Sequence, residues 1–214
     1  MLVQEFLTLL KDPLSFLNSF IADHGTLTYG LIFLIIFVET GLVVFPLLPG
    51  DSLLFSLGLL AANGEDLSIS TIVPLLILAA ILGDQVNYFI GKYFGAIVLK
   101  KEKIFLLKKE HIEKTQDFYT RYGTNTVILA RFIPIVRTVA PFVAGTGKMK
   151  YSLYLLFGFL GATIWVSSIT SLGYFLGDNQ WVNQNFEKVV LLIVILSVLP
   201  IIIGFLKAKI KPKN

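Results

Sequence analysis

The sequence FVETGLVVFPLLPGDSLLF, residues 37–55, lies inside an apolar stretch from Leu27 to Ala62 and decides how that stretch can fold. As one helix, the stretch would be about 54 Å long, far more than a hydrocarbon core of about 30 Å. Pro46 and Pro49 each remove an amide donor, and Gly50 permits a sharp reversal of the chain. The apolar segments before and after the two prolines are then each too short or only marginally long enough to span the hydrocarbon core. We therefore expect residues 27–62 to form a re-entrant hairpin.

A second broken apolar stretch covers residues 122–147. It contains the sequence RFIPIVRTVAPFVAG, in which Pro134 and Pro141 interrupt the apolar run and Gly145 follows. The same reasoning predicts a second re-entrant hairpin. Its non-helical tip must be covered by protein or water, because lipid cannot satisfy free backbone groups.

Each predicted hairpin is followed by an uninterrupted apolar stretch, residues 69–94 and 151–177, which is long enough for a transmembrane helix. The two stretches share a short echo, YFIG at 88–91 and YFLG at 174–177. This order predicts an all-α polytopic membrane protein built as an inverted repeat of re-entrant hairpin plus transmembrane helix. Residues 189–206 would add a C-terminal transmembrane helix.

The composition of the whole chain also indicates a membrane protein. Hydrophobic residues make up 55% of its 214 residues, charged residues make up 15%, and the mean hydropathy is +0.78. A soluble domain of this length cannot bury that much apolar surface. The net charge of +4 comes from lysines and arginines beside apolar runs, which is typical of membrane orientation. We expect one membrane domain over residues 1–214 and no nucleic-acid partner.

The basic residues predict the orientation of the chain. They concentrate in residues 98–121, expected to form a cytoplasmic amphipathic helix, and in a basic tail, residues 207–214. The loops at 63–68 and 177–187 are acidic or neutral and should lie outside. The first hairpin would then open outward and the second toward the cytoplasm. Residues 1–26 read as an amphipathic surface segment or as a first helix packed on the bundle, on an undetermined side.

Four charged residues lie inside the predicted hairpins: Glu39, Asp51, Arg131 and Arg137. At about 2.5 to 3.5 kcal/mol each at the bilayer centre, together they cost about 10 kcal/mol before pairing. We expect the two acids to pair with the two arginines where the hairpin tips meet. The acids could carry protons, and the arginines could hold an anion such as a phosphate head group. The alternative is a structural salt-bridge lock between the hairpins.

Other intramembrane polar or small residues receive more modest interpretations. Asp84, in LGDQVNYFIG, either supports the same site or makes a hydrogen bond to a neighbouring helix. Trp165 is expected to pack or to sit at the membrane interface. Gly158 and Gly161 are expected to permit close helix contact rather than to bind anything.

The sequence predicts no metal, cofactor or enzymatic activity. His24 and His111 are far apart and lack ligand partners at metal spacing, and the chain has no cysteine. We find no phosphate-binding glycine loop, nucleophile elbow or zinc-protease motif.

Three segments resemble the DedA family, also called the VTT or SNARE-associated Golgi domain family. They are residues 37–55, residues 83–95 (GDQVNYFIGKYFG) and residues 118–165, which carry the pattern R-F-x-P-x-V-R-T-x-x-P-x-x-A-G. The resemblance covers most of the chain. It implies a multi-pass protein of the bacterial inner membrane with two re-entrant hairpins. The cytoplasmic C-terminus is expected from the basic tail, not from the resemblance.

The resemblance also implies functional roles for the two hairpin acids and the two hairpin arginines. Some relatives act as flippases for undecaprenyl phosphate or phospholipids, and others look like proton-coupled transporters of drugs or cations. We therefore expect a translocase for an anionic lipid, linked to the proton motive force and serving envelope homeostasis. The alternatives are a proton-coupled cation or drug antiporter and a non-transport membrane scaffold. Expected partners are membrane lipids, including a polyprenyl phosphate, and protons, while homo-oligomerisation stays open.

Overall fold

The computed structural model describes residues 12–42, 50–64, 67–99, 103–104 and 107–177, and only single residues or pairs beyond them. The chain divides into two units, Met1–Asp178 and Asn179–Asn214. All elements below belong to the first unit. The hairpin tip with Pro46 and Pro49, nearly all of the predicted span 189–206 and the basic tail lie outside the described residues.

The described part of the first unit is almost entirely helical. Its helices are α2 (Pro13–His24), α3 (Leu27–Gly41), α4 (Gly50–Asn63), α5 (Ile69–Leu99), α6 (Lys109–Tyr122), α7 (Thr126–Leu129), α8 (Pro134–Thr146) and α9 (Tyr151–Leu176), with single 3₁₀ turns η1 (Gly123–Asn125) and η2 (Ala130–Phe132). Strands β1 (Lys103–Ile104) and β2 (Leu107–Lys108) form a small antiparallel pair.

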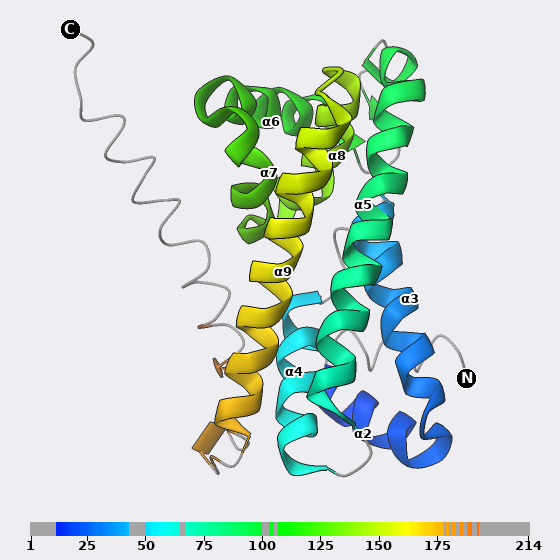
Figure 1. Ribbon diagram of the computed structural model, residues 1–214, viewed down its shortest axis with the longest axis vertical. Coiled ribbons are helices and arrows are strands. Elements are labelled where there is room, and N and C mark those ends of the chain that lie inside the picture. Colours follow the sequence, from blue (N-terminus) through cyan, green and yellow to red (C-terminus); the bar gives the residue numbers. More distant parts are fainter. Residues whose placement is uncertain are drawn as a thin grey trace, which may run out of the picture. The chain divides into compact units, whose positions relative to one another are not determined.

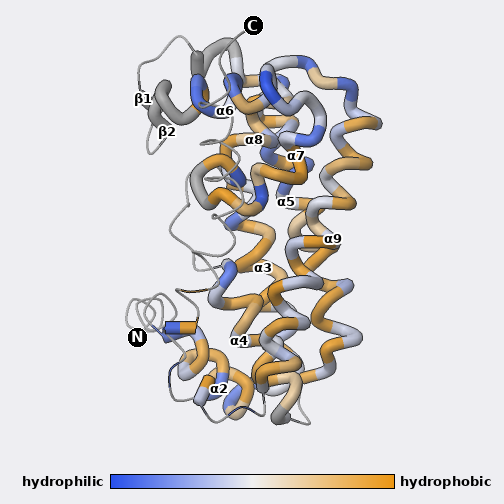
Figure 2. Tube along the Cα trace, turned by 90° about the vertical axis from the view of Figure 1, so that its left-hand side faces the viewer, coloured by the Kyte–Doolittle hydropathy of each residue, from blue (hydrophilic) through white to orange (hydrophobic). Residues whose placement is uncertain are grey.

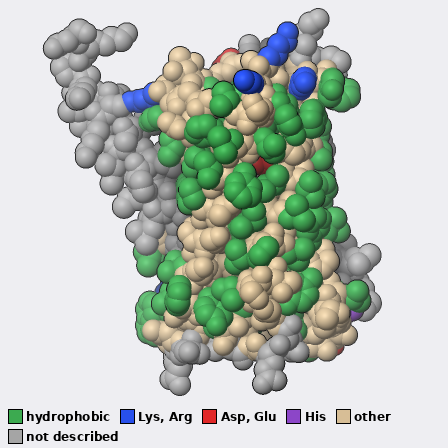
Figure 3. Space-filling view, viewed as in Figure 1, with side chains coloured by type: hydrophobic (Ala, Val, Ile, Leu, Met, Phe, Trp, Pro, Cys, Tyr) green, Lys and Arg blue, Asp and Glu red, His purple; other side chains and the backbone are tan. Residues whose placement is uncertain are grey.

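Two of these helices are long and apolar enough to cross a membrane. The spans are Ile69–Gly95 within α5, with 27 residues, and Tyr151–Leu176, with 26 residues. Each exceeds a hydrocarbon core of about 30 Å, since 26 residues extend about 39 Å. In Figure 1 they run side by side along the vertical axis. Figure 3 shows hydrophobic side chains over most of this face and Lys and Arg side chains at its upper end.

The shorter helices fall into two groups along these two long helices. Helices α2, α3 and α4 lie along the lower half in Figure 1, and α6, α7 and α8 lie along the upper half. Figure 2 shows that hydrophilic residues concentrate around α6, whereas α3 and α4 are mostly hydrophobic. The N-terminal helix α2 begins at Pro13, is capped by the Asp12 side chain, which accepts a hydrogen bond from Ser15 N at 3.1 Å, and packs on α4 and α3.

The two groups contact the long helices in a reciprocal pattern. Helix α3 packs on α5, the long helix that comes after α2, α3 and α4 in sequence. In the same way α7 packs on α9, the long helix that comes after α6, α7 and α8. The second arms cross over: α4 packs mainly on α9, and α8 mainly on α5. Each long helix is therefore held between one arm of its own group and one arm of the other.

Glycines bring the crossing helices into backbone contact. Gly173 of α9 lies against the Phe55 and Leu59 backbone of α4, and a Cβ at Gly173 would overlap the Phe55 carbonyl. Gly145 of α8 lies equally close to the Tyr88 carbonyl of α5. The two crossings therefore use the same device, a glycine that allows van der Waals contact between backbones.

The structure differs from the sequence prediction in two segments. The amphipathic helix expected over residues 98–121 is not continuous: α5 extends to Leu99, β1 and β2 follow, and α6 begins only at Lys109. In the second hairpin the chain breaks at Ile133, which is extended with φ −117° and ψ 111°, and Pro134 is the first residue of α8. Pro141 lies inside α8 and does not end it.

Candidate functional site

Arg137 is held between the two acids of the first predicted hairpin. Its Nη2 donates to Glu39 Oε1 at 2.5 Å, and its Nη1 donates to Asp51 Oδ1 at 2.7 Å. Glu39 comes from the last turn of α3, Asp51 from the first turn of α4, and Arg137 from the first turn of α8. The side chains of Glu39 and Arg137 are only 1% and 8% exposed. We call these three residues the Arg137 centre.

Trp165 of α9 completes the Arg137 centre. Its Nε1 donates to Asp51 Oδ1 at 2.9 Å, and the guanidinium of Arg137 lies 4.8 Å from the centroid of its ring. The expectation that Trp165 packs is confirmed, because its side chain is 1% exposed. The expected place at the membrane interface does not fit this buried position, and both its polar and its aromatic parts contact charged groups. A signal was available: Trp165 lies near the middle of the predicted span 151–177, whereas interface tryptophans lie near the ends.

Arg131 forms a separate centre. It makes an ion pair with Asp84 of α5 and donates from Nη2 to the Gly158 carbonyl of α9 at 3.1 Å. The expectation that Arg131 pairs with the acids of the first hairpin was therefore wrong, and Asp84 takes that role. Gly158 was expected only to permit close contact, but its carbonyl also binds Arg131. Gly161 provides the space that the Arg131 side chain needs, since a Cβ at Gly161 would lie 2.8 Å from Arg131 Nε.

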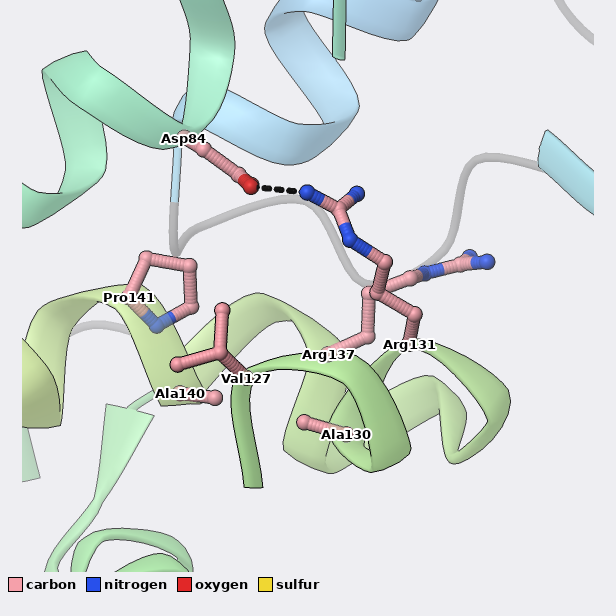
Figure 4. Close-up of a pocket in the computed structure, with 7 residues that line it drawn as sticks. All are labelled: Asp84, Val127, Ala130, Arg131, Arg137, Ala140 and Pro141. Atoms are coloured by element: carbon pink, nitrogen blue, oxygen red, sulfur yellow. Dashed lines mark hydrogen bonds and ion pairs between the residues drawn. The ribbon is translucent and has the colours of Figure 1, made fainter. Parts of the chain in front are cut away.

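A small cavity lies between the two centres. It is lined by Asp84, Val127, Ala130, Arg131, Arg137, Ala140 and Pro141, and its volume of about 10 Å³ is near the lower limit for holding one water molecule. Figure 4 shows Arg131 reaching toward Asp84 while the Arg137 side chain extends in another direction. Among the described residues, Arg131 Nε and Nη1 and Arg137 Nε are buried donors without a hydrogen-bond partner. Charged residues of both centres therefore line the same cavity.

Asn87 ties the C-terminal end of α3 and the N-terminal end of α8 to α5. Its Nδ2 donates to the Thr40 carbonyl at 3.0 Å and to the Thr138 carbonyl at 2.8 Å. Thr40 follows Glu39 in α3, and Thr138 follows Arg137 in α8. A single buried amide on α5 thus fixes the two helix ends that bring the ion pair together. Asn87 was quoted in the sequence motif but was given no role of its own.

The glycines predicted to support the site contribute space. A Cβ at Gly50 would overlap the carboxylate of Glu39, so this glycine is needed to bring α4 beside the acid. Gly145 allows α8 to approach α5 closely, as described above. The sequence reasoning assigned Gly50 to a chain reversal, and the structure adds this steric role.

The two centres together contain three carboxylates and two guanidinium groups, with a formal charge of −1 when all are ionised. Within the described part of the chain, no group of three or more His, Cys, Asp or Glu side chains could hold a metal ion. Buried carboxylates beside arginines can exchange protons, and a guanidinium fork can bind an oxyanion. Those are the two kinds of chemistry that this arrangement offers.

Comparisons with known proteins give consistent results. The family model described as VTT domain matches residues 48–175. The chain is 43% identical to Protein DedA of Escherichia coli (strain K12) over 194 residues, which cover 90% of this chain and 89% of the relative. It is 44% identical to the uncharacterized membrane protein Rv0364 of Mycobacterium tuberculosis over 81% of this chain and 76% of the relative. It is 30% identical to the inner membrane protein YqjA of Escherichia coli (strain K12) over 82% of this chain and 80% of the relative. No solved structure matches the chain.

Proposed function

The chain belongs to the VTT domain (DedA) family of membrane proteins, as its motifs predicted, and from this premise we propose that it translocates an anionic lipid across the membrane, coupled to protons. The observation that carries the proposal is Arg137, a buried guanidinium shared by Glu39 and Asp51. A polyprenyl phosphate or a phospholipid would supply the anionic group.

The proposed cycle exchanges carboxylates for phosphate on one arginine. In the state described here, Arg137 Nη1 and Nη2 each donate a hydrogen bond to a carboxylate. When protons enter and neutralise Glu39 and Asp51, the guanidinium loses its ionic partners and can bind a phosphate through the same two Nη groups. Loss of the protons on the other side restores the ion pairs and releases the phosphate. Proton movement and lipid movement would then be linked through the same residue.

We also propose that the architecture is an inverted repeat of two re-entrant hairpins. The reciprocal crossing of α4 onto α9 and α8 onto α5 supports this arrangement, as does the position of the Arg137 centre at the ends of three helices. In such repeats the substrate site lies near the bilayer midplane, where broken helices meet. The basic residues around α6 favour a cytoplasmic side for that end. The name of the relative YqjA, an inner membrane protein, supports an inner-membrane location in a bacterium.

A flipping assay in liposomes tests the function. We would reconstitute the wild type, Arg137→Lys, Arg137→Ala and the control Lys188→Gln at an exposed lysine, and follow a fluorescent polyprenyl phosphate and a fluorescent phosphatidylglycerol with and without a pH gradient. Wild type and control should move at least one of the two faster under the gradient, and both Arg137 variants should not. A lysine offers one point charge instead of a planar fork. If the folded wild type moves neither lipid, the proposal is overturned.

Proton-coupled cation antiport is a second candidate, because the net charge of −1 in the Arg137 centre favours a cation when the arginine serves only as a counter-ion. In that case Arg137→Lys should retain most activity. A pure membrane scaffold is a third, favoured by the closed ion pairs. It predicts no flux of any substrate, and full function in a charge-swapped variant that restores the fold.

A further inference from the structure

An open groove lies outside both charged centres, between α6 with η1 on one side and the end of α8 on the other. Its volume is about 480 Å³. Its lining residues are Gln116, Tyr119, Thr120, Gly123, Thr124, Val143, Ala144, Gly147 and Met149. That volume is in the range of small-molecule and lipid-sized sites, which hold about 300 to 1,000 Å³.

The groove has an apolar floor and a polar rim. Val143 and Ala144 are buried and Met149 is half-buried, whereas Gln116 and Thr120 on the rim are exposed. The hydroxyl of Tyr119 donates to the Ala140 carbonyl at 3.1 Å. Burial raises the pKa of Tyr119, so this hydroxyl stays protonated and bound to α8. No charged side chain is among the lining residues that the structure describes, which suits the glycerol and upper acyl region of a lipid.

The groove lies at the level of a membrane interface. Gly147 and Met149 come immediately before α9, whose 26 residues are longer than the hydrocarbon core. The aromatic side chains of Tyr93, Phe94 and Tyr151 are exposed at this end of the long helices. Exposed tyrosine and phenylalanine rings near helix ends are typical of the boundary between acyl chains and head groups. An occupant of the groove would therefore meet both environments.

Exposed lysines flank the groove. Lys148 stands between the lining residues Gly147 and Met149 in a left-handed conformation, with φ 53°, and Lys150 follows. Both lysine side chains are exposed. Surface lysines attract anionic head groups. The two lysines and the apolar floor of the groove therefore fit an amphiphile with a phosphate at its polar end.

We propose that this groove binds one anionic phospholipid from the adjacent leaflet, with its glycerol region under the rim of Gln116 and Thr120 and its phosphate toward Lys148. The site is separate from the Arg137 centre. The proposal does not depend on transport, because a bound lipid would hold α6 against α8 whether or not any lipid is moved.

Photolabelling of the full chain in liposomes tests this binding. The probes are phosphatidylglycerol and phosphatidylcholine, each with a diazirine near the top of one acyl chain, and mass spectrometry locates the labelled peptides. We expect phosphatidylglycerol to label residues 116–124 and 143–149 more than phosphatidylcholine does. The Gly147→Leu variant should lower this labelling about tenfold, which corresponds to about 1.4 kcal/mol of lost binding. Gly147 is exposed and has an ordinary φ of −75°, and a Cβ there would lie 3.2 Å from the Val143 carbonyl oxygen, so leucine fits after a shift of a few tenths of an ångström.

Gly30→Leu is the control for the added side chain, because Gly30 in α3 is exposed and a Cβ there meets no atom within 4 Å. Its labelling of residues 116–149 should equal that of the wild type. The Lys148→Gln, Lys150→Gln double variant should remove the preference for phosphatidylglycerol but keep the fold. Equal labelling in wild type and Gly147→Leu, labelling spread evenly over α5 and α9, or cross-links to a second protein chain would overturn the proposal.

Discussion

Trp165 and Arg137 donate hydrogen bonds to the same oxygen atom, Asp51 Oδ1, at 2.9 and 2.7 Å. The arginine also lies over the face of the indole ring, 4.8 Å from its centroid. Trp165 therefore fixes both members of the ion pair: one by its N–H group and the other by its π face. The long helix α9 thereby takes part in a site otherwise built from the ends of α3, α4 and α8.

Replacing Trp165 should separate these two contributions. Trp165→Phe keeps an aromatic face but loses the hydrogen bond to a carboxylate, and should lower the free energy of unfolding by about 1.5 to 3 kcal/mol. Trp165→Leu should lower it further, by up to about 2 kcal/mol, because the cation–π contact is also lost. Denaturation in mixed micelles measures both changes. Trp181→Phe, at an exposed tryptophan, is the control and should leave stability unchanged.

Breaking the Asp84–Arg131 pair should destabilise the fold more than removing the pair. Asp84→Asn leaves Arg131 buried with the Gly158 carbonyl as its remaining described partner, at a cost of about 3 to 5 kcal/mol. The double variant Asp84→Asn, Arg131→Met should recover part of that loss, because no buried charge is left unpaired. A double-mutant cycle of unfolding free energies measures the coupling. Additive losses would contradict a direct ion pair, and Asp23→Asn on exposed α2 should have no effect.

Glu39→Gln should uncouple transport from protons without unfolding the protein. Glutamine keeps the shape of the buried side chain, and Arg137 retains Asp51 as an ionic partner. We expect an initial flipping rate that no longer changes when a pH gradient is imposed. The exposed Glu113 provides the matched control, and Glu113→Gln should respond to the gradient like the wild type. A gradient response in Glu39→Gln equal to that of the wild type would remove Glu39 from the coupling step.

Gly173→Ala should disturb the crossing of α4 and α9. The added methyl group would overlap the Phe55 carbonyl, so the helices must separate, with an expected loss of about 1 to 3 kcal/mol in unfolding free energy. Gly30→Ala adds the same methyl group where α3 has open space, and alanine favours a helix by up to about 1 kcal/mol over glycine. Thermal unfolding in detergent should therefore show a lower Tm for Gly173→Ala and not for Gly30→Ala. Equal shifts would show that backbone contact at this crossing is unimportant.

Local sequence rules predicted the helices well but not their partners. Chain length and apolar content placed α5 and α9, and Pro134 was expected to interrupt the second apolar stretch, where the structure has a break at Ile133, because these are local steric and solvation effects. The continuous helix expected over residues 98–121 was wrong, since the charge pattern that suggested it does not reveal the strand pair at 103–108. Which arm crosses to which long helix depends on tertiary packing, which no single segment specifies.

The charged residues of the candidate site were predicted correctly, but only one of the two arginines has the partners that were expected. The acids Glu39 and Asp51 do meet an arginine of the second hairpin, as expected from the cost of isolated charges in lipid. Arg131 lies only six positions before Arg137 but reaches Asp84 on α5 instead, because it comes before the break at Ile133, on the other side of the turn. Charge balance indicates that partners exist, whereas the path of the backbone decides which ones.

The ion pair between Glu39 and Arg137 also sets an order of events during synthesis, because the two residues are 98 positions apart. At about 5 to 20 residues per second, the acid leaves the ribosome about 5 to 20 seconds before its arginine. During that interval the first helices must shelter a carboxylate that has no cation yet. Insertion of this protein is therefore completed only when residues near 137 arrive, so a ribosome that stalls earlier leaves an unbalanced charge at the membrane.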